Sequence, residues 1–295
     1  MKLINTLYYI YNIILFSFFI TFSFSQESKL DHTILDNNDT DKDGYTDLEE
    51  QNFGSNFKDS LSVIYKGGWP YNVDKIHMTD LKFRDCDSLP FGNGCECTED
   101  AQCMEGSDCE ILFTSQNCVP KEGAKLPRFI GTDQFGDSVD LYDLINQGHP
   151  IIIEISAMWS NPSSLLAGWL AGNPTNIKKM KWWQDNFEEV KTIVNSKEVY
   201  YVRVLHQGPV KGEPITDDEV AYWHKEFPNI NIITIADPEA KIKTWVRPTG
   251  LPCIMLFNED LTIFTPAEGN NADAQRRRGL KAPFEALIDF NKKNR

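Results

Sequence analysis

The chain has 295 residues, of which 41% are hydrophobic, and it carries a net charge of −14 at pH 7. This length is sufficient for a sizeable core and at least one further module. The strong negative charge argues against nucleic acid and anionic membrane surfaces as partners, because both repel an acidic protein. A run of arginines, Arg276–Arg278, is interpreted as a solvated surface segment.

Residues 1–25 have the features of an export signal. Lys2 supplies the positive start, residues 7–22 are mostly apolar, and small residues precede the expected cleavage between Ser25 and Gln26. A retained membrane anchor is the alternative, because the apolar run approaches spanning length. No cysteine lies at the cleavage site, which argues against a bacterial lipid anchor. The sequence therefore predicts a secreted or periplasmic cell-envelope protein, with no membrane association beyond a cleaved signal.

An acidic segment, residues 26–60, contains the calcium-loop pattern of an EF-hand at residues 39–50. Oxygen-bearing side chains occupy the first, third, fifth and ninth loop positions, a glutamate the last, and Gly44 the position of the sharp bend. Ca²⁺ prefers several hard oxygen ligands, so this spacing predicts calcium as a cofactor. The alternative is a flexible acidic linker. The predicted ligands are Asp39, Asp41, Asp43, Tyr45 through its backbone carbonyl, Asp47 and Glu50.

The surroundings of this loop differ from those of a paired calcium sensor. No amphipathic helix clearly precedes Asp39, and no second loop accompanies it. Together with the stretch 48–54 and Asp59–Ser60 that follow, the loop resembles the calcium-binding repeats of exported bacterial proteins. That resemblance implies a structural Ca²⁺ site of modest affinity, suited to extracellular calcium.

Residues 61–120 form a predicted cysteine-rich module. A segment this small buries little core and needs covalent links, and clustered cysteines in an exported chain predict a disulfide framework. Three disulfides are expected, with fifteen pairings possible. A zinc site is disfavoured, because no Cys-x-x-Cys pair or nearby histidine provides the usual ligand spacing. A rigid spacer and a recognition module are both open as roles. The cysteines concerned are Cys86, Cys95, Cys97, Cys103, Cys109 and Cys118.

Residues 121–295 are predicted to form the main domain. Apolar residues spaced three and four apart from Ile177 to Val194 predict one long amphipathic helix. Thr216–Glu219 is a capping box that starts a further helix. The other expected elements are a strand, turn, strand and short helix over 126–144, a buried strand at 151–155 leading into a helix from Pro162, strands at 199–205, 230–235, 253–257 and 262–265, a short helix at 237–245 and a closing helix at 280–290.

The turn that follows the first buried strand carries a family resemblance. Its sequence at 159–163, WSNPS, resembles the active-site turn of the thioredoxin and redoxin superfamily, in which a Trp precedes Cys-x-x-Cys. Here Ser160 and Ser163 occupy both cysteine positions. Pro252, just before a buried strand, matches the cis-proline of that superfamily. The resemblance implies an α/β thioredoxin fold, with a central mixed sheet flanked by helices, after a small disulfide-rich and calcium-loop region.

The same resemblance bears on the chemistry. Dithiol exchange needs a thiolate, which the hydroxyl of Ser160 cannot replace. Activation of Ser160 by His206 or His224 is disfavoured, because nothing in the sequence brings either histidine to it. The seventh cysteine, Cys253, lies next to Pro252. It is interpreted either as a reactive thiol or, preferably, as a small buried hydrophobe.

Two functional hypotheses follow. In the first, the protein is a non-catalytic binding or structural protein with a degenerate redox turn, whose groove near Trp159, Ser160 and Pro252 holds an extended peptide or protein segment. In the second, it is a thiol-disulfide oxidoreductase or antioxidant protein that works through Cys253 or a disulfide of the 86–118 cluster. A reactive thiol in the folded protein would favour the second.

Overall fold

The computed structural model describes residues 38–53, 55–60, 62–83, 86–112, 115–266 and 280–294. The predicted signal segment and the arginine run lie outside these residues. The chain divides into two compact units, Met1–Val63 and Ile64–Arg295, which are described separately here. The second unit therefore contains both the cysteine-rich module and the main domain.

In the described part of the first unit, the acidic loop leads into one short helix, α3 (Asp47–Phe53). Thr46 starts the helix with a capping box. Its hydroxyl accepts a hydrogen bond from the Glu49 backbone N–H, and the Glu49 carboxylate accepts from the Thr46 N–H at 2.8 Å. The acidic residues of the first turn also suit the positive end of the helix dipole.

The cysteine-rich module is built on a hairpin of β1 (Ser107–Leu112) and β2 (Ser115–Pro120), preceded by a 3₁₀ turn, η2 (Asp100–Gln102). All six clustered cysteines are disulfide-bonded, which confirms the predicted framework and selects one of the fifteen pairings. The bonds are Cys86–Cys95, Cys97–Cys109 and Cys103–Cys118.

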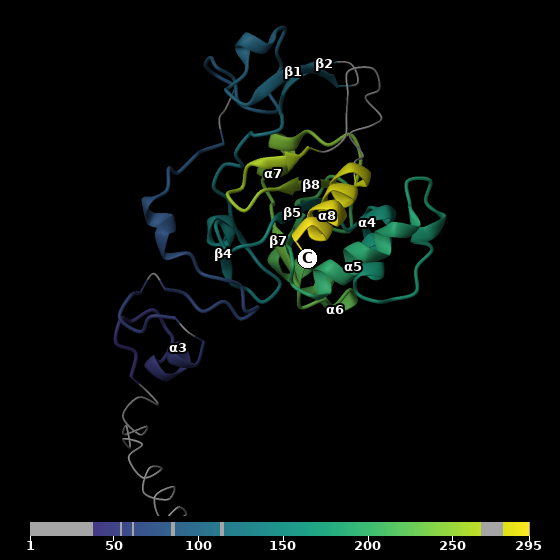
Figure 1. The fold of residues 1–295 in the computed structure, drawn as a ribbon. Coiled ribbons are helices and arrows are strands. Elements are labelled where there is room, and N and C mark those ends of the chain that lie inside the picture. Colours follow the sequence, from purple (N-terminus) through teal and green to yellow (C-terminus); the bar gives the residue numbers. More distant parts are fainter. Residues whose placement is uncertain are drawn as a thin grey trace, which may run out of the picture. The chain divides into compact units, whose positions relative to one another are not determined.

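This module packs closely on helix α7 (Lys241–Val246) of the main domain. At Gly94, which has a φ of +91°, an added Cβ would lie 2.6 Å from the Thr244 carbonyl oxygen. Only glycine fits both this backbone conformation and this approach. Figure 1 shows the β1–β2 hairpin beside α7.

The main domain is organised around a five-stranded sheet with strand order β7-β6-β5-β8-β9. The first three strands are parallel, whereas β8 runs antiparallel to β5 and β9 antiparallel to β8. Every residue of β5 is buried, as expected for a central strand covered on both faces. The strands are β5 (Ile151–Ser156), β6 (Tyr200–Leu205), β7 (Ile232–Ala236), β8 (Cys253–Phe257) and β9 (Ile263–Thr265).

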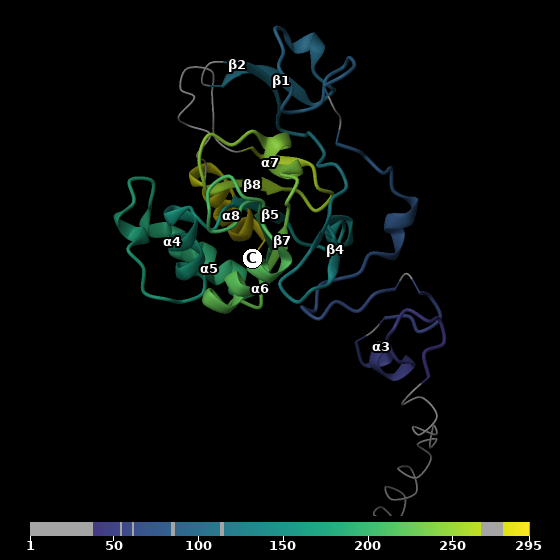
Figure 2. The same ribbon diagram turned by 180° about the vertical axis from the view of Figure 1, so that it is seen from behind.

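Helices cover this sheet and complete a thioredoxin fold, which confirms the predicted fold class. One apolar cluster joins the sheet to α4 (Asn161–Leu170), α5 (Glu188–Asn195) and α8 (Lys281–Asn294). These three helices lie side by side in both views (Figures 1 and 2). Helix α6 (Asp217–Glu226) begins with the predicted capping box at Thr216. A small antiparallel pair, β3 (Ile130–Thr132) and β4 (Ser138–Asp140), followed by a 3₁₀ turn, η3 (Leu141–Leu144), precedes the sheet.

The single long helix predicted between Ile177 and Val194 is wrong. The structure has two 3₁₀ turns there, η4 (Ile177–Lys179) and η5 (Asp185–Phe187), and a regular helix only from Glu188. Met180 and Gln184, which flank the segment between them, have extended backbones with ψ of 138° and 146°, and a turn closed by the Trp183 N–H and the Met180 carbonyl oxygen at 3.0 Å lies between them. Trp183 fills the gap by packing edge-on against Trp169 and Phe187. A non-helical chain can therefore return apolar side chains to one core at near-helical intervals.

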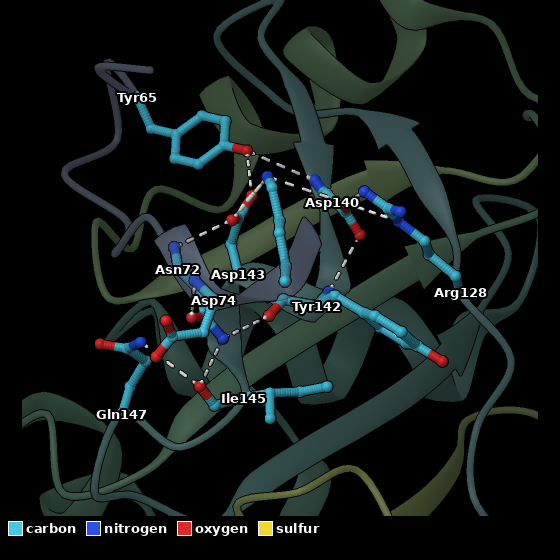
Figure 3. Close-up of polar contacts among 10 residues, drawn as sticks. Tyr65, Asn72, Asp74, Arg128, Asp140, Tyr142, Asp143, Ile145 and Gln147 are labelled. Carbon is cyan, nitrogen blue, oxygen red and sulfur yellow. Dashed lines mark hydrogen bonds and ion pairs between the residues drawn. The ribbon is translucent and has the colours of Figure 1, made fainter. Parts of the chain in front are cut away.

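A strap, residues 64–77, holds the start of the second unit against η3 through a buried polar network (Figure 3). The strap contains a 3₁₀ turn, η1 (Val73–His77). Fully buried Asp143 accepts hydrogen bonds from the Tyr65 hydroxyl at 2.5 Å, the Lys75 ammonium at 2.7 Å and the Asn72 backbone N–H at 3.0 Å. We call the five charged or phenolic members the strap cluster: Tyr65, Lys75, Arg128, Asp140 and Asp143.

Candidate functional site

The serines of the WSNPS turn have structural positions at the start of α4. Ser160 is the N-cap, and its hydroxyl accepts a hydrogen bond from the Ser163 backbone N–H at 3.4 Å. Pro162 lies in the first helical turn, where its missing N–H costs no hydrogen bond. Ser163 is fully buried, and its hydroxyl has no hydrogen-bond partner in the described part of the chain. The first serine therefore performs the ordinary task of a helix cap.

The Trp159 ring is held in place from the loop after β6. Its indole N–H donates to the Gln207 side-chain oxygen at 2.7 Å. The Lys211 ammonium lies 5.0 Å from the ring centroid, within cation–π range. The half-buried ring thus presents a fixed apolar surface beside Ser160.

An open groove of about 590 Å³ lies over this turn, within the size range of ligand sites. Pro252 forms part of its wall, and the Leu251–Pro252 peptide bond is cis. The turn and the proline are therefore brought together, as the resemblance implied. The remaining wall comes from the irregular segment between α4 and α5, which sequence reasoning took for a helix. The lining residues are Trp159, Ser160, Asn161, Pro162, Lys179, Met180, Lys181, Trp182, Gly250, Leu251, Pro252 and Leu280.

One rim of the groove offers free backbone groups. Within the part of the chain that the structure describes, the N–H and C=O of Gly250 and Leu251 form no hydrogen bond. Unpaired backbone groups at an open edge are the groups that an extended peptide pairs with when it adds to a protein.

Cys253 lies outside the groove. It is fully buried at the start of β8, opposite Ile155 of β5, and belongs to none of the three disulfides. Burial among apolar strand residues fits a small hydrophobic side chain.

Neither histidine considered as a base for Ser160 is bonded to it. The His206 ring bonds to the Ser156 carbonyl oxygen at 2.9 Å, and His224 packs edge-on against Phe135. Burial lowers the pKa of both imidazoles. Neither of these two described histidines therefore forms a serine–histidine pair with Ser160.

A buried ion pair lies on β5 and β6, a feature that sequence reasoning missed. Glu154 and Arg203 face each other in the register, are almost completely buried, and approach to 3.0 Å. Tyr201 donates a further hydrogen bond to Glu154 at 2.7 Å, and Ser156 donates another. The sequence did contain a signal for this pair: Glu154 and Arg203 each lie inside an apolar strand segment. Because buried charges are nearly always paired, two such residues predict each other as partners.

The calcium loop gathers carboxylates in the first unit. Oxygens of Asp39, Asp41 and Asp43 all lie within 4.8 Å of one another. Asp41, Asp43 and Glu50 each have one buried carboxylate oxygen without a hydrogen-bond partner among the residues that the structure describes. Burial, and the charges of neighbouring carboxylates, raise the pKa of Asp43 and Glu50. Glu50 is not part of the group of three aspartates. Clustered carboxylates with buried oxygens that accept no hydrogen bond within the described chain fit a divalent cation, because such oxygens are the ligands that Ca²⁺ prefers.

Other loop positions match the pattern in part. Gly44 has a φ of +101°, so the bend occurs where the pattern predicts it. Asp39 accepts hydrogen bonds from the Lys42 and Gly44 N–H groups, which shapes the turn. Asp47 accepts from Thr40 and from Asn38, so its oxygens are engaged within the protein. The ninth loop position often reaches calcium through a water molecule, and Asp47 suits that role.

No protein-family model matches the sequence, and no curated protein matches it either. Among solved structures, the chain is similar to the thioredoxin domain of a thiol-disulfide oxidoreductase from Bacteroides vulgatus, with 13% identity, a TM-score of 0.37, and coverage of 59% of this chain and 96% of that one. A thiol peroxidase from Chromobacterium violaceum gives 13% identity, a TM-score of 0.39, and coverage of 64% and 94%. A hypothetical protein from Sinorhizobium meliloti gives 12% identity, a TM-score of 0.42, and coverage of 59% of this chain and 86% of that one.

The strand order of the sheet and the helix that follows β5 give the main domain a thioredoxin-like fold. The three disulfides of the cysteine-rich module are compatible with an extracellular or periplasmic setting. Among the described residues, none of the helices is both long and apolar enough to cross a membrane.

Proposed function

We propose that this is an exported thioredoxin-like protein that binds an extended segment of a partner in the groove and performs no dithiol exchange. The observation that carries the proposal is the state of the turn. Serine replaces both thiols, Ser160 caps the helix, and none of the described residues that line the groove is a cysteine. Without a thiolate at the helix N-terminus, the disulfide exchange of this fold has no nucleophile.

The buried position of Cys253 also supports a binding role over the redox alternative. A thiol can attack a disulfide only if the two sulfurs meet, and Cys253 is fully enclosed at the start of β8. An oxidoreductase would have to expose it.

Insulin-disulfide reduction with a dithiol donor tests this part of the proposal. We expect the wild-type protein to be inert and the Ser160→Cys/Ser163→Cys variant to turn over insulin, because the cysteines would lie at the N-terminus of α4. Turnover by the wild type that disappears in a Cys253→Ala variant would instead establish the redox alternative.

We further propose that the calcium loop holds one structural Ca²⁺. Asp39, Asp41, Asp43 and Glu50 would supply carboxylate oxygens, Tyr45 its carbonyl, and Asp47 a water-mediated contact. Isothermal titration calorimetry with CaCl₂ tests this site. A Glu50→Gln variant should lose binding, whereas Glu49→Gln, which makes the same charge change and preserves the capping box, should bind normally. Equal binding by both variants would overturn the assignment.

A further inference from the structure

The charges around the groove differ in sign from those of the protein as a whole. The chain carries a net charge of −14. Within the described chain, the only ionisable side chains that line the groove are those of Lys179 and Lys181. A third cation, Lys211, lies over the Trp159 ring at the same turn.

The two lysines that line the groove, Lys179 and Lys181, form no ion pair within the described chain, unlike the lysine beside them. Lys178, the immediate neighbour, pairs with Glu188 at 2.7 Å. Lys179 and Lys181 are exposed, and neither forms an ion pair with any carboxylate of the described chain. In an acidic protein, two adjacent unpaired cations on a groove wall create a local positive potential that attracts negative charge.

Most of the remaining lining is apolar or aromatic, and we call this part of the lining the floor of the groove. Trp159, Met180, Trp182 and Leu251 are half-buried and face the groove. A segment that fills it therefore needs an apolar side chain for the floor and carboxylates for the rim. The unpaired backbone of Gly250 and Leu251 favours an extended chain over a helix.

We propose that the groove selects acidic extended peptides, with an aromatic or aliphatic side chain on the Trp159–Trp182 floor and flanking carboxylates against Lys179 and Lys181. This rests on the proposed function, that the groove binds an extended segment, and it adds the chemical class of that segment. Opposite charges at a rim select the partner and speed its association.

Fluorescence polarisation with labelled peptides tests the selection. The probes share a central Phe and differ only in its flanks: Glu and Asp in the first peptide, Gln and Asn in the second, Lys in the third. We expect the affinity to fall in that order. The preference for the acidic peptide should also weaken as salt is added, because exposed charge pairs are screened.

Protein variants locate the effect. Lys179→Gln/Lys181→Gln should weaken binding of the acidic peptide about tenfold, as expected for two exposed ion pairs, and leave the neutral peptide unchanged. The matched control is Lys178→Gln/Lys225→Gln, which removes the same charge outside the groove lining. It should bind the acidic peptide nearly as well as the wild type.

The outcomes separate the two proposals. If the neutral peptide binds as tightly as the acidic one and the Lys179/Lys181 variant changes nothing, the charge selection is overturned while the groove remains a peptide site. If none of the three peptides binds, the proposed function itself fails, and the selection fails with it. A labelled single-stranded oligonucleotide that bound as tightly as the acidic peptide would overturn the assignment to peptides.

Discussion

Two groups of carboxylates in this chain have opposite relations to their surroundings. In the strap cluster, Asp143 is fully buried, but the protein supplies every partner, including the Lys75 ammonium at 2.6 Å (Figure 3). In the calcium loop, three carboxylates have buried oxygens that receive no hydrogen bond, and no protein cation approaches them among the described residues. An acidic sequence pattern alone does not separate these cases. The difference is whether a cationic side chain of the protein lies next to the buried carboxylates, as Lys75 does beside Asp143.

The strap cluster should give the largest effect when a partner is removed. Asp143→Ala leaves the Lys75 ammonium buried without its closest carboxylate, and the loss of a buried partner costs about 3–5 kcal/mol. Chemical denaturation should show that decrease in the free energy of unfolding of the second unit. Asp80→Ala, at an exposed pair with Lys82, is the control and should change it by under about 0.5 kcal/mol. If both variants lowered the free energy of unfolding by a similarly small amount, the buried ion pair of the strap cluster would be no stronger than an exposed one.

The calcium loop should respond to an added ion, and the strap cluster should not. At a Ca²⁺ concentration about a hundred times the dissociation constant, binding to the folded state alone stabilises it by about 2.7 kcal/mol. Hydrogen exchange should therefore slow across residues 38–60 and stay unchanged across residues 64–77. Glu50→Gln should abolish the slowing. Slowing in the strap as well as in the loop would show that the two regions are coupled.

Acid should weaken calcium binding, with a sign that follows from the raised pKa values. Without the ion, burial raises the pKa of Asp43 and Glu50, so both hold protons at a pH where exposed carboxylates have lost them. These protons stabilise the ion-free loop as pH falls through the raised pKa, and Ca²⁺ must displace them. The calcium affinity should therefore fall as pH is lowered from neutral, with proton release on binding. Calorimetry in buffers of different ionisation enthalpy measures that proton release. Its absence would contradict the idea that protons and Ca²⁺ compete for the same carboxylates.

The sequence predicted most of the fold because periodicity and caps are local signals. The predicted order of strands and helices, together with the resemblance of the WSNPS turn, implied the thioredoxin fold, and the capping box at Thr216 correctly predicted the start of α6. The failure at Ile177–Val194 has a physical cause: buried spacing records which side chains reach the core, not whether the backbone stays helical between them. The groove wall built by that segment was therefore out of reach. For the same reason, the sequence did not predict that Lys179 and Lys181 line this groove.

The exposed end of the strap should give the smallest effect. The Lys66 ammonium pairs with Asp137 at 2.8 Å, but its side chain is 56% exposed, and exposed pairs contribute at most about 1 kcal/mol. The backbone N–H of the same residue donates to Asp137 at 2.6 Å, and that bond survives truncation of the side chain. Lys66→Ala should therefore lower the free energy of unfolding by under about 1 kcal/mol, against the far larger loss for Asp143→Ala. A loss of similar size in both variants would mean that burial is not what makes the strap cluster strong, because the two carboxylates differ chiefly in the exposure of their cation.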